Sequence, residues 1–398
     1  MAVLRFLADK FSHLKITLSK IKRNLSLYGK KMDGFDEVFV EITSHCNFHC
    51  EFCPSDSLLR KKEDIKDEYM LKILCELRDK NKIIAFHVLG EPLLNKNFFK
   101  YLSLCDEYNI EAHPTTNMSL LTEDVLEKIL SHKCVTLIQL SFQTGNEESF
   151  KLRGSNMAFD KYLQLLENIV FNEKRIASNC KININIMNDY HCHNDKLWGI
   201  FNPEKFWQFM DIMERWKEKL VSQGAPDKSP CKSHVGNLYY GKLADIPQDF
   251  YNHADEIHYE ITPNLAVFVK HVGKFGMPDA FVDYLNNRKN CQYKVKNIPR
   301  LFPIPCWSVR VPCVLSNGEI TCCCVDIEGT LSLGNIGRVS LEEAAKSKKR
   351  TLVMKYPMLF ETCRKCKGKL VFKNKIKDIN PSTSMRAGNV IEKRLEAI

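Results

Sequence analysis

Short apolar runs alternate with stretches of helical periodicity from residue 37 onward. Helices are predicted at 67–80, 97–108, 122–131 and 159–172, between the runs EVFVEIT, KIIAFHVLG, IEAHPTT, VTLIQLSF and KININIMN. Such alternation predicts a parallel sheet with crossover helices, an α/β fold. Five readable units indicate a full or partial (β/α) barrel, in which chemistry lies at the carboxyl ends of the strands.

The flanking regions divide the chain into further parts. Residues 1–35 are basic, with apolar residues at helical spacing, and are predicted to form an N-terminal helical extension that packs on the domain; a membrane-surface helix is the alternative. The barrel is assigned to 36–300, a small C-terminal hairpin and helix module to 301–369, and a tail to 370–398. Asn317-Gly318 predicts the hairpin, with strands at 309–315 and 319–325 and a helix at 341–349.

Composition narrows the class of protein. The 398 residues are 44% hydrophobic and 27% charged, which is typical of a globular protein. No signal peptide and no apolar run of about 20 residues occurs, so a cytoplasmic protein without a transmembrane span is expected. In a reducing compartment, 17 cysteines indicate metal ligands or catalytic thiols more than disulfides.

The formal charge of +10 suits an anionic or phosphorylated partner, although a solubilising surface is the more ordinary explanation. The chain has no zinc finger, RNA-recognition signature or stripe of aromatic and basic residues. No specific nucleic acid is therefore expected as a partner.

The first cysteine cluster lies in EITSHCNFHCEFCPS, directly after the first predicted strand. Cys46, Cys50 and Cys53 can bind three irons of a cubic cluster and leave the fourth iron open to a substrate or cofactor. The alternative is zinc, for which His45 or His49 would supply a fourth ligand.

The spacing CxxxCxxC, with Phe52 before the last cysteine, resembles the signature of the radical S-adenosylmethionine (SAM) superfamily. Three further segments resemble family segments that bind SAM: Gly90-Glu91-Pro92 after the second strand, Thr116-Asn117 after the third, and Ser141 with Arg153-Gly154 at and after the fourth. Three positions depart from the family pattern, namely Leu89, Met118 and Gln143.

This resemblance implies a 4Fe–4S cluster on Cys46, Cys50 and Cys53. It also implies SAM bound by Phe52, Gly90, Glu91, Pro92, Asn117, Ser141 and Arg153. The implied activity is generation of a 5′-deoxyadenosyl radical that abstracts hydrogen from a substrate. A flavodoxin- or ferredoxin-type electron donor is the expected partner.

The second cysteine cluster lies in the C-terminal module. Cys363 and Cys366 form a CxxC pair, and Cys306 and Cys323 flank the predicted hairpin, which gives four thiolates for zinc or a closed cluster. The run from Gly318 to Ile336 resembles the SPASM extension in its shortened form, Twitch, with one auxiliary 4Fe–4S cluster. That pattern selects Cys323 over Cys322 and Cys324. Strand alternation would point Cys322 and Cys324 to one face of the strand and Cys323 to the other. Cys313 is an alternative ligand to Cys306.

Three functions remain open from the sequence. The short extension resembles that of 2-deoxy-scyllo-inosamine dehydrogenase, which predicts oxidation or epimerisation of a sugar-like or other small polar substrate. The alternatives are a SPASM maturase that modifies a peptide or protein, and a structural zinc protein with a degenerate barrel. No catalytic residue is fixed by pattern; His191 and His193, after the fifth strand, are the candidates.

Overall fold

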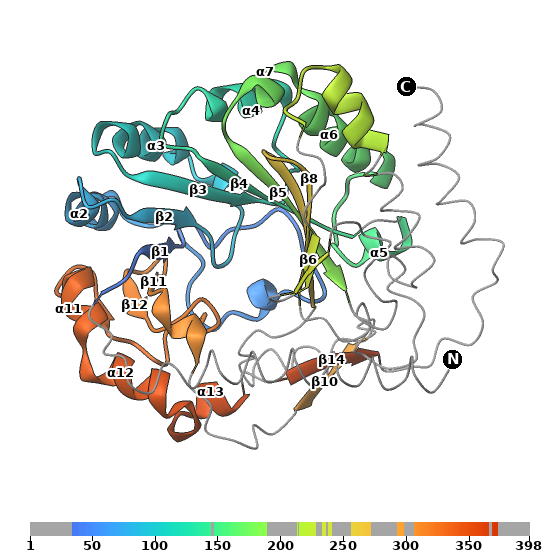
Figure 1. Cartoon of the computed structure of the whole chain (residues 1–398). Coiled ribbons are helices and arrows are strands. Elements are labelled where there is room, and N and C mark those ends of the chain that lie inside the picture. Colours follow the sequence, from blue (N-terminus) through green and yellow to red (C-terminus); the bar gives the residue numbers. More distant parts are fainter. Residues whose placement is uncertain are drawn as a thin grey trace.

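Five parallel strands in chain order form the centre of the fold, as the alternation predicted (Figure 1). Along β3 and β4, buried residues alternate with partly exposed ones, which gives each strand one face in the core. The strands are β1 (Glu37–Val40), β2 (Ile83–Phe86), β3 (Glu111–Thr116), β4 (Leu137–Gln143) and β5 (Lys181–Asn188).

The computed structural model describes only part of the chain. The described residues are 34–144, 147–188, 213, 215–227, 233–235, 238–240, 256–271, 293–297, 306–365 and 368–372. The predicted N-terminal helix and the candidates His191, His193 and Cys366 lie outside these ranges. In the part of the chain that is described, no helix is long and apolar enough to cross a membrane.

Among the described strands the sheet is not closed, which agrees with the partial barrel of the two predicted forms. Its order is β13-β12-β11-β1-β2-β3-β4-β5-β9-β8-β6-β7, and among the described strands the two ends do not pair with each other. The strands added to the central five are β6 (Ser233–Val235), β7 (Leu238–Tyr240), β8 (Glu256–Thr262), β9 (Leu265–His271), β11 (Cys313–Val314), β12 (Glu319–Thr321) and β13 (Gly334–Asn335).

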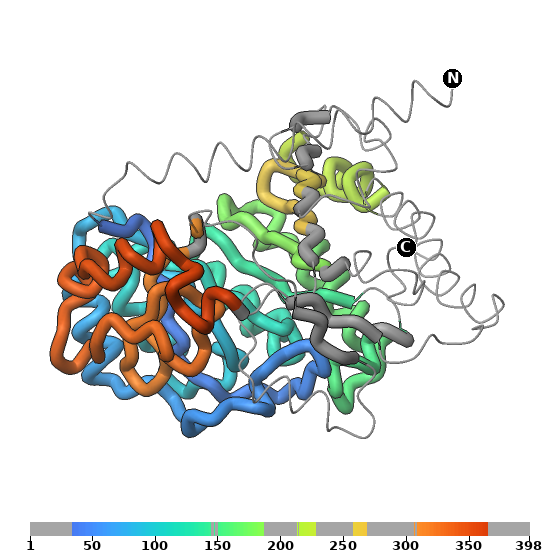
Figure 2. The backbone as a smooth tube through the Cα atoms, turned by 90° about the horizontal axis from the view of Figure 1, so that it is seen from below, coloured from blue at the N-terminus to red at the C-terminus, as the bar shows by residue number. Residues whose placement is uncertain are grey.

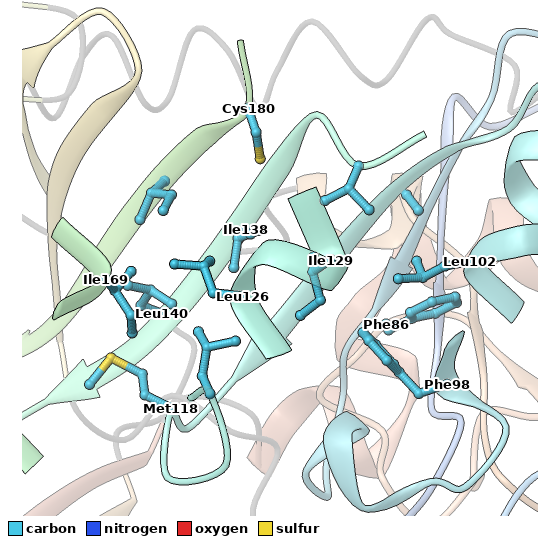
Figure 3. Packing of buried hydrophobic residues seen from close by; sticks show 14 of the residues in the cluster. Phe86, Phe98, Leu102, Met118, Leu126, Ile129, Ile138, Leu140, Ile169 and Cys180 are labelled. Atoms are coloured by element: carbon cyan, nitrogen blue, oxygen red, sulfur yellow. The ribbon is translucent and has the colours of Figure 1, made fainter. Parts of the chain in front are cut away.

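Helices cover the outer face of the curved sheet (Figure 1). Their apolar faces pack on the strands: in Figure 3, Leu126 and Ile129 point from their helix toward Ile138 and Leu140. The helices of this layer are α2 (Asp67–Leu77), α3 (Phe98–Glu107), α4 (Glu123–Leu130), α5 (Glu147–Lys151), α6 (Phe159–Phe171) and α7 (Glu173–Ala177). Four of them lie where the sequence predicted helices.

The C-terminal module continues the same sheet. Strand β11 pairs in parallel with β1, and β11 and β12 form the predicted antiparallel hairpin. Figure 2 shows the module beside the first strands of the chain. The module also contains α11 (Leu341–Lys346), α12 (Lys348–Lys355), α13 (Glu361–Lys365) and the 3-10 helices η5 (Trp307–Arg310) and η6 (Pro357–Leu359).

Two predictions for the module were wrong in detail. The hairpin strands are shorter than expected, since η5 occupies 307–310 and β12 ends at Thr321. The helix predicted at 341–349 is interrupted by Ser347, which has extended backbone angles and whose hydroxyl accepts from the N–H of Arg350 to begin α12. The predicted tail begins inside a strand, because β14 (Gly368–Phe372) pairs with β10 (Tyr293–Asn297).

Candidate iron–sulfur site

Cys46, Cys50 and Cys53 lie on the loop between β1 and the 3-10 helix η1 (Pro54–Ser57), all three partly exposed. The loop turns on itself where the N–H of Cys53 donates to the carbonyl of Cys50 at 3.0 Å. It is held from outside by the segment after α5, where the carbonyls of Leu152 and Arg153 accept from Glu51 and His49. The three thiols therefore lie at the carboxyl end of β1, the edge where the parallel strands direct their loops.

Two glycines allow neighbouring strand ends to approach this loop. A Cβ on Gly90 would lie 2.1 Å from the carbonyl oxygen of Thr43, and one on Gly154 would lie 2.5 Å from that of His49. Both glycines also have positive φ, at +76° and +55°. Only glycine fits these two approaches, which places the segments after β2 and after α5 directly against the cysteine loop.

Side-chain N–H groups from two of these segments reach the sulfurs. The amide Nδ2 of Asn117, just after β3, lies 3.7 Å from Sγ of Cys46. The guanidinium Nε of Arg153, after α5, lies 3.2 Å from Sγ of Cys50. The backbone N–H of Phe48 also donates to Cys46, at 3.5 Å. Each of these N–H groups would stabilise negative charge on the sulfur that accepts it.

Burial opposes ionisation of the three thiols in the absence of a cation. Burial, together with the charges of Cys50 and Glu91, raises the pKa of Cys46 to about 11, although hydrogen bonds from Phe48 and Asn117 lower it. The pKa values of Cys50 and Cys53 are raised as well, first by burial. Three clustered soft sulfur donors of this kind suit an iron centre, whose positive charge stabilises the thiolates, so the donor set fits the implied cluster.

Glu91 is turned into the protein. Its carboxylate accepts from the hydroxyl of Thr116 at 2.8 Å, the N–H of Asn117 at 2.6 Å and the N–H of Leu93. Burial raises the pKa of Glu91 to about 7 against these hydrogen bonds. The carboxylate thus joins the end of β3 to the segment after β2.

The other predicted SAM contacts lie around the same edge. Phe52 is buried, Pro92 begins the 3-10 helix η2 (Pro92–Leu94), and Ser141 lies in β4 with its carbonyl accepting from Arg153. Sequence reasoning missed Tyr162, whose hydroxyl donates to the carbonyls of Asn117 and Ser141. The only sequence signal for Tyr162 was its place on the apolar face of the predicted helix.

Five of the described cysteines of the C-terminal module pack in two apolar clusters. Cys322 and Cys363 pack in one apolar cluster with Cys306 at its margin, whereas Cys313 packs in another with Cys324 and Cys53 at its margin. The expectation that Cys322 and Cys324 share a face was wrong, because β12 ends before them and the chain turns there, with the Thr321 hydroxyl donating to the carbonyl of Cys323.

Hydrogen-bond direction separates some of these thiols from those of the first loop. Sγ of Cys322 donates to the carbonyl of Leu331 at 3.5 Å, and Sγ of Cys313 to that of Val311 at 3.9 Å. Donation to a carbonyl requires a protonated thiol. Ligation by Cys306, Cys323, Cys363 and Cys366 remains a prediction.

A buried ion pair joins the two regions. Arg60 follows the cysteine loop, and its Nη2 lies 2.6 Å from Oε1 of Glu41, which is fully buried. Its Nη1 donates to the hydroxyl of Ser316 at 3.0 Å and its Nε to the carbonyl of Ile327 at 2.6 Å. The other oxygen of Glu41 accepts the N–H of Ser316 at 2.9 Å. Sequence reasoning missed Arg60, which has no local pattern to mark it.

In the described ranges, His, Cys, Asp and Glu side chains form no group of three or more that could hold a metal ion. The ligands of a single ion converge on one centre, whereas the ligands of a cubic cluster each bind a different iron. The absence of a single-ion site among these residues therefore does not bear on the cubic cluster expected on the loop.

Comparison with known proteins gives two family matches. Residues 40–190 match the model described as "Radical SAM superfamily", and residues 306–367 match SPASM, described as "Iron-sulfur cluster-binding domain". The first range holds the cysteine loop and the ends of β2 to β4. The second holds the module cysteines.

Individual relatives match shorter stretches. The chain is 35% identical over 100 residues to the "S-adenosyl-L-methionine-dependent 2-deoxy-scyllo-inosamine dehydrogenase" of Niallia circulans, which is 24% of this chain and 40% of that protein. It is 29% identical over 159 residues to the "GTP 3',8-cyclase" of Campylobacter lari, 36% of this chain and 47% of that one. Each match spans less than half of the relative's length.

Solved structures with similar folds include SuiB from Streptococcus suis bound to S-adenosylmethionine. It has a TM-score of 0.47 at 16% identity over 81% of this chain and 68% of that chain. BtrN in complex with AdoMet and 2-DOIA has a TM-score of 0.39 at 15% identity over 84% of this chain and 92% of that one.

Proposed function

Because this chain belongs to the radical SAM superfamily and carries a SPASM module, we propose that it is a radical SAM enzyme with its SAM-binding cluster on Cys46, Cys50 and Cys53. The observation that carries the proposal is the convergence on this loop of Gly90 after β2, Asn117 after β3 and Arg153 after α5. When bound, such a cluster with SAM supplies a carbon-centred radical that abstracts hydrogen.

This chain's own residues have positioning roles in the proposal. Asn117 and Arg153 donate to the sulfurs, and Glu91 fixes the end of β3 against the end of β2. The auxiliary cluster is assigned to Cys306, Cys323, Cys363 and Cys366, of which the last lies outside the described residues. SAM contacts are assigned to Phe52, Gly90, Glu91, Pro92, Asn117, Ser141 and Arg153.

For the reaction, we propose oxidation of a small polar substrate such as an amino sugar or cyclitol. The 35% identity to a SAM-dependent dehydrogenase of 2-deoxy-scyllo-inosamine supports this class. Loss of two electrons from an alcohol needs an acceptor for the second electron, and an auxiliary cluster close to the substrate would provide it.

The test is anaerobic reconstitution followed by iron, sulfide and zinc analysis. Two cubic clusters require about eight irons and eight sulfides per chain. SAM and dithionite are then incubated with a panel of aminocyclitols, phosphorylated sugars and short peptides, and deoxyadenosine is quantified. Formation with a cyclitol supports the proposal, formation only with a peptide makes the protein a maturase, and zinc in place of iron at the first loop would refute it.

A further inference from the structure

The guanidinium of Arg153 is fixed beside one sulfur of the first loop. The side chain is buried, with the residue 1% exposed. Its Nη1 donates to the carbonyls of Ser141 and Phe142, both at 2.8 Å, which leaves Nε directed at Sγ of Cys50 at 3.2 Å. Because two carbonyl groups bind the guanidinium on its other side, it has little freedom to move away from the sulfur.

Aromatic rings complete the surroundings of this cation. The guanidinium carbon lies 4.9 Å from the ring centroid of Phe48 and 5.8 Å from that of Tyr162. Cation–π contacts of this kind favour the charged group in place, and they exclude water that would screen it.

The sulfurs of the loop are consequently not equivalent. Among the described contacts, Cys46 accepts from two neutral donors, the amide of Asn117 and the N–H of Phe48. Cys50 accepts from a full positive charge. Two acidic residues act electrostatically on these sulfurs. Asp56 forms an ion pair with Lys62, and the carboxylate of Glu91 accepts a hydrogen bond from Thr116 in β3.

A charge-assisted N–H···S bond strengthens as negative charge on the sulfur grows. One-electron reduction of a 4Fe–4S cluster from the 2+ to the 1+ state adds that negative charge and changes no bond or proton. A buried cation at the sulfur therefore favours the reduced state over the oxidised one, since hydrogen bonds to sulfur and net charge are what a protein uses to tune such clusters.

We propose that Arg153 is a positioning residue that raises the reduction potential of the cluster through its bond to Cys50, in addition to any contact with SAM. The inference rests on the proposed function, because it requires a cluster on this loop. It predicts that replacing Arg153 makes the cluster harder to reduce even when no SAM is present.

The experiment compares reconstituted full-length wild type, Arg153→Gln, Arg153→Lys and Arg175→Gln in anaerobic dithionite titrations followed by electron paramagnetic resonance, without SAM. A double variant of Cys363 and Cys366 to Ala in each background removes the auxiliary signal. Arg175 is the matched control, because it is equally buried but bonds to Val170 and Asn264 instead of the loop.

We expect Arg153→Gln to lower the ratio of reduced to oxidised cluster at a fixed potential about tenfold, equivalent to about 59 mV for a one-electron couple. Arg153→Lys keeps the charge without the Nε–H and should shift the ratio less. Arg175→Gln should lower thermal stability and leave the potential unchanged.

An unchanged potential in Arg153→Gln would overturn the inference, as would an equal shift in Arg175→Gln. If Arg153→Gln holds no cluster, an unchanged potential in Arg153→Lys overturns it instead. Wild type that binds no iron on the first loop is a different result, since it refutes the proposed function itself.

Discussion

The two cysteine-rich regions treat their sulfurs in opposite ways. In the first loop, Cys46 accepts an N–H group from Asn117 after β3, and Cys50 accepts one from Arg153 after α5. In the C-terminal module, Cys313 and Cys322 donate to carbonyls inside apolar clusters. Burial raises the pKa of the thiols in both regions, so the difference lies in the hydrogen bonds: only the first pair of sulfurs has N–H donors that would stabilise a thiolate.

The largest difference should appear when each kind of cysteine is replaced by alanine in turn. Replacing Cys46, Cys50 and Cys53 together by Ala is expected to abolish SAM cleavage and remove about four irons per chain, because three ligands are lost. The double variant Cys313→Ala/Cys322→Ala should keep its iron and its cleavage of SAM. Iron analysis and chromatography of deoxyadenosine measure both. Loss of about four irons in the double variant would mean that hydrogen-bond direction does not identify ligands.

The next effect concerns the contact between the regions. Glu41 is fully buried, and burial raises its pKa even though the charge of Arg60 acts to lower it. Arg60→Gln leaves this carboxylate without its cation and should cost about 3–5 kcal/mol in the free energy of unfolding, measured with urea on the iron-free protein. Lys62→Gln, at the partly exposed pair with Asp56, should cost less than about 1 kcal/mol. Equal costs for the two would show that the buried pair does not hold the module.

Much of the fold could be predicted because its signals are local. Alternating burial in β3 and β4 and the start of α4 after Thr122 follow from periodicity and capping. The pairing of Phe39 with Cys313 in β1 and β11 could not be predicted, because it joins residues far apart in sequence whose strands carry no register signal. The break at Ser347 was hidden by helical residues on both sides.

The candidate site was predictable as a set of strand ends but not in its contacts. Spacing and resemblance marked Cys46, Asn117 and Arg153. That Arg153 reaches Cys50, and that Glu91 points inward, depends on how closely the segments after β2 and α5 approach the cysteine loop. Those are properties of packing, which no single segment encodes.

The stability of the fold should depend on pH through Glu91, whose carboxylate points into the protein. The pKa of Glu91 in the fold is about 7, above its ordinary value of 4.5, so the folded state binds more protons between these values. Stability should therefore fall by about 3 kcal/mol as pH rises from 4.5 to 7 on account of this group. Urea unfolding of iron-free wild type and Glu91→Gln at pH 5 and pH 8 measures it. The prediction fails if both proteins lose the same stability over this range.

The smallest expected effects come from removing one helix cap in each region, and they test whether the two regions unfold together. Ser340 caps α11 in the module by accepting from Glu343 at 3.1 Å, and Thr122 caps α4 in the barrel by accepting from Val125 at 3.4 Å. Ser340→Ala should cost about 1 kcal/mol and Thr122→Ala about 0.5 kcal/mol. Because β11 continues the sheet of β1 and Arg60 bonds to both regions, each variant should lower the same single transition. Hydrogen exchange checks this: loss of protection confined to residues 306–365 in Ser340→Ala would show a module that opens by itself, whereas an equal loss in the core strands shows one cooperative unit.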